Sequence, residues 1–307
     1  MRNKHIKIYI RILDSSINFC IFLFLLLLLS YGCYAMWDSE QIYVSGDSAN
    51  YQVYKPSEEN ELSFKDLKNK NSDVLGWINV YGTKIDYPLL QGEDNQKYIS
   101  MNSLGDYSLA GSIFLDYRNK PDFTDFNTII FGHHMEKSAM FGDLERFFEK
   151  DFFEQNRYGR LHYDSKDHGI EFFAFMEVDA FDSRIYKIPV DQIQAKQEYL
   201  EIITNQSKYY RDIGVSTDDR LVVLSTCTQN TTNGRHILVG RITDKVFLEP
   251  KKANKRVGKE RFFQSSMFLE RMKENTIVVC LFSLFTIALF FLYLSKKRKL
   301  KKDGENE

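Results

Sequence analysis

A cysteine and an arginine that could act on the same carbonyl group lie close together in the chain. Residues 221–242 read LVVLSTCTQNTTNGRHILVGRI, with Cys227 ending one apolar run and Arg235 opening the next. This pattern predicts two β-strands joined by a polar loop. On neighbouring strands, a thiol nucleophile and a cation that stabilises negative charge would face each other. A cysteine after an apolar strand is more often a small core residue, so this stretch alone does not favour a nucleophile.

A histidine follows another predicted strand. The apolar segment 127–131 (NTIIF) leads directly into Gly132, His133 and His134. An imidazole at the mouth of a loop is well placed to act as a general acid or base. Adjacent histidines can also indicate a metal site, but the remaining histidines of this region show no zinc-ligand spacing with them. We therefore favour proton transfer by His133 over metal binding.

Composition describes a protein with a sizeable core and unequal charge along the chain. The 307 residues are 43% hydrophobic and carry a net charge of −1, which gives no indication of a nucleic-acid partner. Residues 1–16 and 295–307 hold ten of the 41 Lys and Arg but four of the 42 Asp and Glu. The ends are therefore basic and the middle is acidic.

Two apolar runs next to the basic ends predict membrane helices. Ile17–Met36 has 20 residues without a charge, enough to span a hydrocarbon core of about 30 Å. We expect an uncleaved anchor, since the apolar part of a cleaved signal peptide would be shorter. Thr276–Leu294 is a second such run, followed at once by the basic tail. Because positive charge marks the cytoplasmic side, both ends are expected inside the cell and residues 37–275 outside.

The predicted protein is thus a two-pass protein of the cell membrane with an extracellular domain. Its expected parts are a basic cytoplasmic N-terminus (1–16), a transmembrane helix (17–36), a linker (37–60), a folded domain (61–249), a basic linker (250–274), a second transmembrane helix (275–295) and a basic cytoplasmic tail (296–307). The basic linker could be simply solvated or could contact anionic lipid or wall polymer.

The positions of the other cysteines make a chemical role for Cys227 more plausible than the Cys227 stretch alone does. The other three cysteines, Cys20, Cys33 and Cys280, belong to the two apolar segments or their edge. Cys227 is then the single thiol of the extracellular domain. In an oxidising compartment, an unpaired cysteine indicates either an intermolecular disulfide or a thiol kept for chemistry.

Short β-prone runs predict a mainly β domain closed into a barrel, with inserted α-helices. The expected strands are Val74–Val80, Ile85–Leu89, Ser112–Asp116, Asn127–Phe131, Arg160–Tyr163, Glu171–Val178, Leu221–Leu224 and Ile237–Ile242. Residues 81–83, 119–121 and 167–169 are expected turns. Apolar spacing predicts helices over Phe141–Gln155 and Asp191–Asn205, and a short helix capped by Ser63.

Three motifs in this order resemble the sortases, the cysteine transpeptidases of the Gram-positive cell surface. They are GSIFLDYRN (111–119), IIFGHHM with MFGDL (129–144) and LSTC with GRHILVGRI (224–242). The similarity covers roughly residues 62–248. The N-terminal helix, the MFGDL segment and the helix near 191–205 resemble class B in particular. The resemblance implies a sortase-like closed barrel and no cofactor.

The resemblance also implies roles for individual residues. Cys227 would be the nucleophile, His133 the general acid and base, and Arg235 the group that steadies substrate and oxyanion. The segment DNQKYI (94–99) is similar to a family motif, so Asn95 and Ile99 are expected to line the substrate groove, with Ser225 beside the nucleophile. A thiolate leaves well from a thioester, so the acyl group can pass to an amine.

The expected partners are surface proteins or pilins that carry a C-terminal sorting motif, and an amine acceptor. Class B sortases that anchor single proteins usually have one N-terminal anchor, whereas the second apolar run is more like the pilin-polymerising sortases. The lid motif of class C polymerases is missing, because Trp37-Asp38-Ser39 does not match it. The acceptor is therefore either a wall-precursor amine or a pilin lysine.

A papain-like cysteine peptidase and a non-catalytic membrane scaffold are the alternatives to a sortase. In papain-like cysteine peptidases the cysteine precedes the histidine, whereas His133 precedes Cys227 here. A membrane-tethered scaffold with a non-catalytic barrel would not need a lone thiol together with both partner residues. Both readings are disfavoured.

Overall fold

The strands of the domain form one continuous sheet. The structure is a computed structural model, and it describes residues 2–57, 61–227 and 233–250. Its strands are β1 (Val74–Val80), β2 (Asp86–Leu90), β3 (Ile113–Leu115), β4 (Asn127–Phe131), β5 (Tyr158–Tyr163), β6 (Lys166–Asp179), β7 (Tyr209–Tyr210), β8 (Arg220–Cys227) and β9 (Gly234–Thr243).

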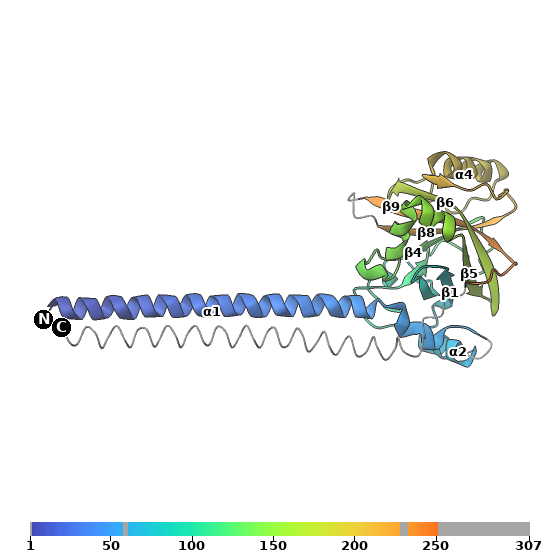
Figure 1. Ribbon diagram of the computed structural model, residues 1–307. Coiled ribbons are helices and arrows are strands. Elements are labelled where there is room, and N and C mark those ends of the chain that lie inside the picture. The colour runs from blue at the N-terminus through green and yellow to red at the C-terminus, as the bar shows by residue number, and fades with distance from the viewer. Residues whose placement is uncertain (1, 58–60, 228–232, 251–307) are drawn as a thin grey trace. The chain divides into compact units, whose positions relative to one another are not determined.

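The sheet closes on itself, which confirms the expected mainly β barrel (Figure 1). Its strand order is β5-β1-β2-β3-β4-β8-β9-β6, and β6 pairs back with β5 to complete eight strands. The short β7 adds to β6 beside the barrel. The pairs β2–β3 and β4–β8 are parallel, and the others are antiparallel. Closure leaves the long strands without free edges.

Helices lie between the strands and before them. The α-helices are α1 (Arg2–Ser45), α2 (Glu61–Lys70), α3 (Lys150–Gln155) and α4 (Ile193–Gln206), and the 3-10 helices are η1 (Ser48–Tyr54), η2 (Lys97–Ile99), η3 (Glu136–Ser138) and η4 (Gly142–Phe148). Ser63, the expected cap of the short helix, lies inside α2, which begins at Glu61.

The N-terminal apolar run is helical, as expected, but the helix is longer than the uncharged run itself. α1 extends beyond residues 17–36 at both ends. Within the described residues, one stretch, His5–Tyr54, is long and apolar enough to cross a membrane by length and composition. The second predicted membrane segment, Thr276–Leu294, lies outside the described residues.

The residues after α1, expected to be a linker, are partly folded onto the barrel. The Tyr87 hydroxyl donates to the Gly46 carbonyl at 2.8 Å and accepts from the Met140 backbone N–H at 2.9 Å. Tyr51 of η1 is 3% exposed, and the Lys55 ammonium lies 2.6 Å from the Asp86 carboxylate. This connector, residues 46–57, therefore belongs to the packed structure.

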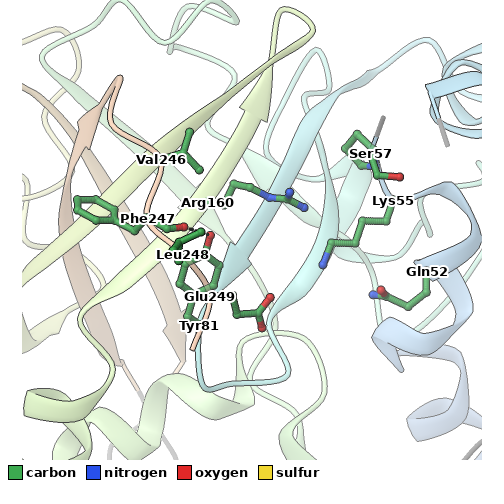
Figure 2. A pocket seen from close by; sticks show the side chains of 10 residues that line it. Gln52, Lys55, Ser57, Tyr81, Arg160, Val246, Phe247, Leu248 and Glu249 are labelled. Atoms are coloured by element: carbon green, nitrogen blue, oxygen red, sulfur yellow. Dashed lines mark hydrogen bonds between the residues drawn. The ribbon is translucent and has the colours of Figure 1, made fainter. Parts of the chain in front are cut away.

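The segment after β9 also packs against the barrel. The Tyr81 hydroxyl donates to the Phe247 carbonyl at 2.9 Å, and the Phe247 ring stacks on Tyr158 with centroids 4.0 Å apart. A cavity of about 460 Å³ is lined by this exit segment, residues 244–249, and by the connector, with Arg160 between them (Figure 2). The two segments that enter and leave the barrel thus border one cavity.

The core has two layers because alternate residues of the strands point to opposite faces. One layer includes Trp77, Phe172 and Leu224, and the other includes Phe173 and Ile203 of α4. Sheet and helix therefore bury both faces of β6 and β8, whose runs are almost continuously apolar. These two buried strands are the rigid base of the candidate site.

The expected helix over Phe141–Gln155 is wrong as a single element. η4 ends at Phe148 and α3 begins at Lys150, and Glu149 between them has an extended backbone (φ −86°, ψ 124°). Phe141, Leu144 and Phe147 are fully buried at intervals of three residues, which is the repeat of a 3-10 helix rather than an α-helix.

The expected turn at 167–169 is also wrong, since these residues lie in β6. Tyr163 and Lys166 face each other as a cross-strand pair, so the turn consists of Asp164 and Ser165. Both have positive φ (48° and 58°), as two-residue hairpin turns of type I′ require.

Candidate active site

Two of the three residues expected to be catalytic lie at the ends of adjacent strands, and the third, His133, follows shortly after a neighbouring strand. Cys227 is the last residue of β8, and its Cα partner on β9 is Arg235. On the other side, β4 runs parallel to β8 with Phe131 opposite Ser225. His133 follows two residues after the end of β4, where the Gly132 N–H donates to the Ser225 carbonyl at 3.2 Å. The side chain of Cys227 and residues 228–232 lie outside the described part of the structure.

His133 is held by a backbone carbonyl. Its Nε2 lies 2.8 Å from the carbonyl oxygen of Ile99. A carbonyl oxygen only accepts hydrogen bonds, so Nε2 must carry a hydrogen and donate it. In the neutral ring the lone pair is then on Nδ1, which is the nitrogen that can take up a proton.

Gly111 makes this contact possible. It has φ +63°, and a Cβ at this position would lie 2.6 Å from the Ile99 carbonyl oxygen and 3.0 Å from Cδ2 of His133. Any other residue would be strained in its backbone and would push these groups apart. The glycine of the motif GSIFLDYRN thus allows Ile99 and His133 to meet.

A cavity of about 450 Å³ joins the expected site residues. All three predicted substrate-binding residues, Asn95, Ile99 and Ser225, line it together with His133 and Arg235. Other described lining residues include Phe114, Asp116, Arg118, Phe131, Thr226, Ala180 and Tyr186. The cavity is of the size that binds small ligands or a short peptide segment.

Tyr186 is a cavity residue that the sequence did not indicate. Its hydroxyl and the Ser225 hydroxyl are hydrogen-bonded at 2.9 Å, and its ring stacks on Phe131 with centroids 6.1 Å apart. It lies between β6 and α4, in the segment 180–192, and this segment contains neither helix nor strand. Only its position in three dimensions connects it to the site.

An ion pair lies in the same cavity wall. The Asp116 carboxylate is fully buried and accepts from Nε and Nη2 of Arg118 at 2.9 Å and 2.7 Å. Burial opposes the charge on Asp116, but the hydrogen bonds from Arg118 outweigh it and hold the pKa of Asp116 below its usual value. Both residues lie in the motif GSIFLDYRN, although no role was predicted for them.

His134 is oriented differently from its neighbour. Its Nε2 lies 3.0 Å from the Glu145 carboxylate of η4. Within the described residues, no three His, Cys, Asp or Glu side chains come close enough to share a metal ion. Only the first histidine of the pair lines the cavity.

Comparison with known proteins shows which family the chain belongs to. The sortase domain family model matches residues 78–243. Sortase B of Listeria monocytogenes is 35% identical over 183 residues, which cover 59% of this chain and 74% of the relative. The chain therefore belongs to the sortase family and is a cysteine transpeptidase. Within that family it is most similar to the class B enzymes.

Solved structures support the same class. The sortase B from the type II pilus of Streptococcus pneumoniae has a TM-score of 0.53 and 47% identity, covering 59% of this chain and 99% of that one. The Streptococcus pyogenes class B sortase involved in pilus biogenesis has a TM-score of 0.54 and 42% identity, covering 58% and 97%. The expected class B resemblance is confirmed.

Proposed function

We propose that the protein is a membrane-anchored enzyme that cleaves a C-terminal sorting motif at a peptide bond and transfers the new carboxyl group to an amine. The observation that carries this proposal is that Arg235 pairs with Cys227 across β8 and β9 and lines the same cavity as His133. In this proposal, Asn95, Ile99 and Ser225 bind the sorting motif beside the nucleophile.

In the first half-reaction, Cys227 attacks the scissile carbonyl carbon as a thiolate, its proton being held by His133. The C–N bond then breaks as His133 gives a proton to the departing amine, and a thioester on Cys227 remains. Arg235 stabilises the negative charge on the carbonyl oxygen, since a guanidinium stays charged throughout. Nδ1 of His133 carries the proton, because Nε2 is already bonded to Ile99.

In the second half-reaction, an acceptor amine attacks the thioester carbon. The amine loses a proton to His133 and the Cys227 thiolate leaves, which restores the starting enzyme. One amine has replaced another on the carboxyl group, so the exchange consumes no water.

The acceptor has two candidates. A wall-precursor amine would anchor a surface protein to the cell wall, whereas a pilin lysine would join pilin subunits. The pilus-related streptococcal enzymes are 47% and 42% identical to this chain, compared with 35% for the Listeria enzyme. The higher identity to the pilus-related enzymes supports a pilin lysine as the second candidate acceptor.

The reaction can be tested directly with full-length protein in detergent. We expect it to convert at least one peptide from a panel of sorting motifs into an amide with an added amine, identified by mass spectrometry. Offering a wall-precursor amine and a lysine-bearing pilin peptide in the same tube reveals the preferred acceptor. If the folded protein forms no amide and no thioester with any peptide, the proposal is incorrect.

We also propose that both ends of the chain lie in the cytoplasm and that the barrel is extracellular. The support is the uncharged run 17–36, which is part of α1, and the run 276–294, each with positive charge beyond it. Two anchors would keep the enzyme near lipid-linked precursors and unreleased surface proteins, so high local concentration would replace tight binding.

Protease accessibility tests this topology. In cells stripped of their wall, an impermeant protease should reach residues 37–275 and leave an epitope after Ser295 protected. Deleting residues 275–307 should spare peptide cleavage by purified protein but reduce product on cells. An epitope cut from outside would mean that one segment does not span the membrane.

A further inference from the structure

The turn after β3 contacts both walls of the active-site cavity. It contains Asp116, Tyr117 and Arg118. On one side, the Tyr117 backbone N–H donates to Oδ1 of Asn95 at 3.0 Å. On the other side, Nη2 of Arg118 donates to the carbonyl oxygen of Tyr186 at 3.3 Å. The turn therefore joins two cavity residues that are far apart in the sequence.

The turn itself is rigid. The Asp116 carboxylate accepts three bonds from Arg118, namely from Nε, from Nη2 and, at 3.0 Å, from the backbone N–H. The Asp116 backbone is also fixed, because its N–H donates to the Ile129 carbonyl at 2.9 Å and its carbonyl accepts from Gln91 at 3.0 Å. A buried carboxylate without such bonds would be strongly destabilising. The guanidinium is thus fixed before any substrate binds.

Tyr186 is held at both of its ends. Arg118 binds its carbonyl oxygen, Ser225 binds its hydroxyl, and the ring between them stacks on Phe131. Its segment, 180–192, has neither helix nor strand to position it. The contact with Arg118 ties this irregular segment to the barrel next to the cavity.

We propose that Arg118 is a positioning residue that holds Tyr186 opposite Asn95 and so sets the width of the groove that receives the sorting motif. This inference rests on the proposed function, because it takes the cavity to be the peptide site. Arg118 acts through Tyr186, while the turn that it stabilises binds Asn95 through the Tyr117 N–H, so neither contact is with the reacting atoms. Loss of Arg118 should therefore weaken peptide binding more than it slows the bond-breaking step.

The decisive variant is Arg118→Lys, which keeps the charge. An ammonium can neutralise Asp116, but it lacks the planar fork that binds both carboxylate oxygens and also reaches the Tyr186 carbonyl. A hydrogen bond to a charged group is typically worth one to two orders of magnitude in an equilibrium constant. We expect KM for a processed peptide to rise by roughly tenfold or more, while kcat changes much less.

Arg157 offers a matched control within the same chain. Its Nε and Nη2 donate to the Glu171 carboxylate at 3.2 Å and 2.9 Å. Its side chain is 38% exposed, as is that of Arg118, and it does not line the cavity. Arg157→Lys should leave both KM and kcat as in the wild type.

A double-mutant cycle tests whether Arg118 acts through Tyr186. Tyr186→Phe removes the hydroxyl bond to Ser225 and leaves the backbone carbonyl in place. If both contacts hold one segment, the combined variant should lose less than the product of the single losses. Thermal unfolding of each variant, with a midpoint close to the wild type, keeps a folding defect from being read as a binding effect.

The outcomes separate this inference from the proposed function. A wild-type protein that processes no sorting peptide overturns both. With an active wild type, an unchanged KM in Arg118→Lys, or a fall in kcat alone, overturns only the role of Arg118. Strictly multiplicative losses in the cycle overturn the route through Tyr186. A raised KM with non-additive coupling, and no effect at Arg157, supports the inference.

Discussion

Replacing Cys227 with alanine is expected to remove nearly all transpeptidation while leaving the protein folded. A nucleophile that forms the covalent intermediate cannot be replaced by its neighbours, and such losses typically amount to several orders of magnitude in kcat. A small core cysteine would behave differently, since its truncation costs about 1 kcal/mol of stability and little activity. Amide product by mass spectrometry and thermal unfolding together distinguish the two interpretations.

Cys33 is the internal control for this substitution. It is a free cysteine of α1, outside the cavity. Cys33→Ala should retain full activity, and a thiol-blocking reagent should inactivate this variant as it does the wild type. Substantial product from Cys227→Ala would mean that the nucleophile has been wrongly assigned.

Changing Arg235 to lysine is expected to lose most of the activity even though the charge is kept. A planar guanidinium can hold a substrate carbonyl and an oxyanion at the same time, whereas an ammonium is a point charge. Removing one such stabilising group typically costs about 10²–10³ in rate. Steady-state kinetics with a processed peptide measures the loss, which should appear in kcat as well as in kcat/KM.

Arg241 lies on the same strand and provides the comparison. Its Nη2 lies 2.9 Å from the Glu171 carboxylate on the neighbouring strand, and it does not line the cavity. Arg241→Lys should be close to wild type in turnover. Near-normal turnover with lysine at position 235 would contradict a geometric role for the guanidinium.

Strong local patterns made most of the barrel predictable. The apolar runs of β1 and β4 were expected with the bounds that the structure shows, because their ends are marked by polar and turn residues. β7 was missed because two tyrosines, Tyr209 and Tyr210, form no pattern, and their pairing with β6 depends on the arrangement of the whole sheet. α4 was expected, but which of its residues face the sheet was not, since Ile193 is 68% exposed whereas Tyr199 is buried.

Some residues of the site were also predictable from the sequence, and others were not. His133, Ile99 and Arg235 could be selected because each lies in a short motif, and the cavity brings them together. Tyr186 has no such signal, because its bond to Ser225 joins residues 39 positions apart in the sequence. Asp116 and Arg118 are close in the chain, but their importance depends on the burial of the carboxylate, which the sequence does not reveal.

The connector and exit segment change what counts as the smallest folding unit. The sortase family match begins at residue 78, inside β1, and ends at residue 243. Asp86 lies within that range, yet its carboxylate binds Lys55 and Gln52 of the connector as well as the Trp77 indole. Trimming to the matched residues would also expose the face of Tyr158 that Phe247 covers. Connector, barrel and exit segment should therefore melt in one cooperative transition, and a fragment cut at the family boundaries would lose part of its thermodynamic unit.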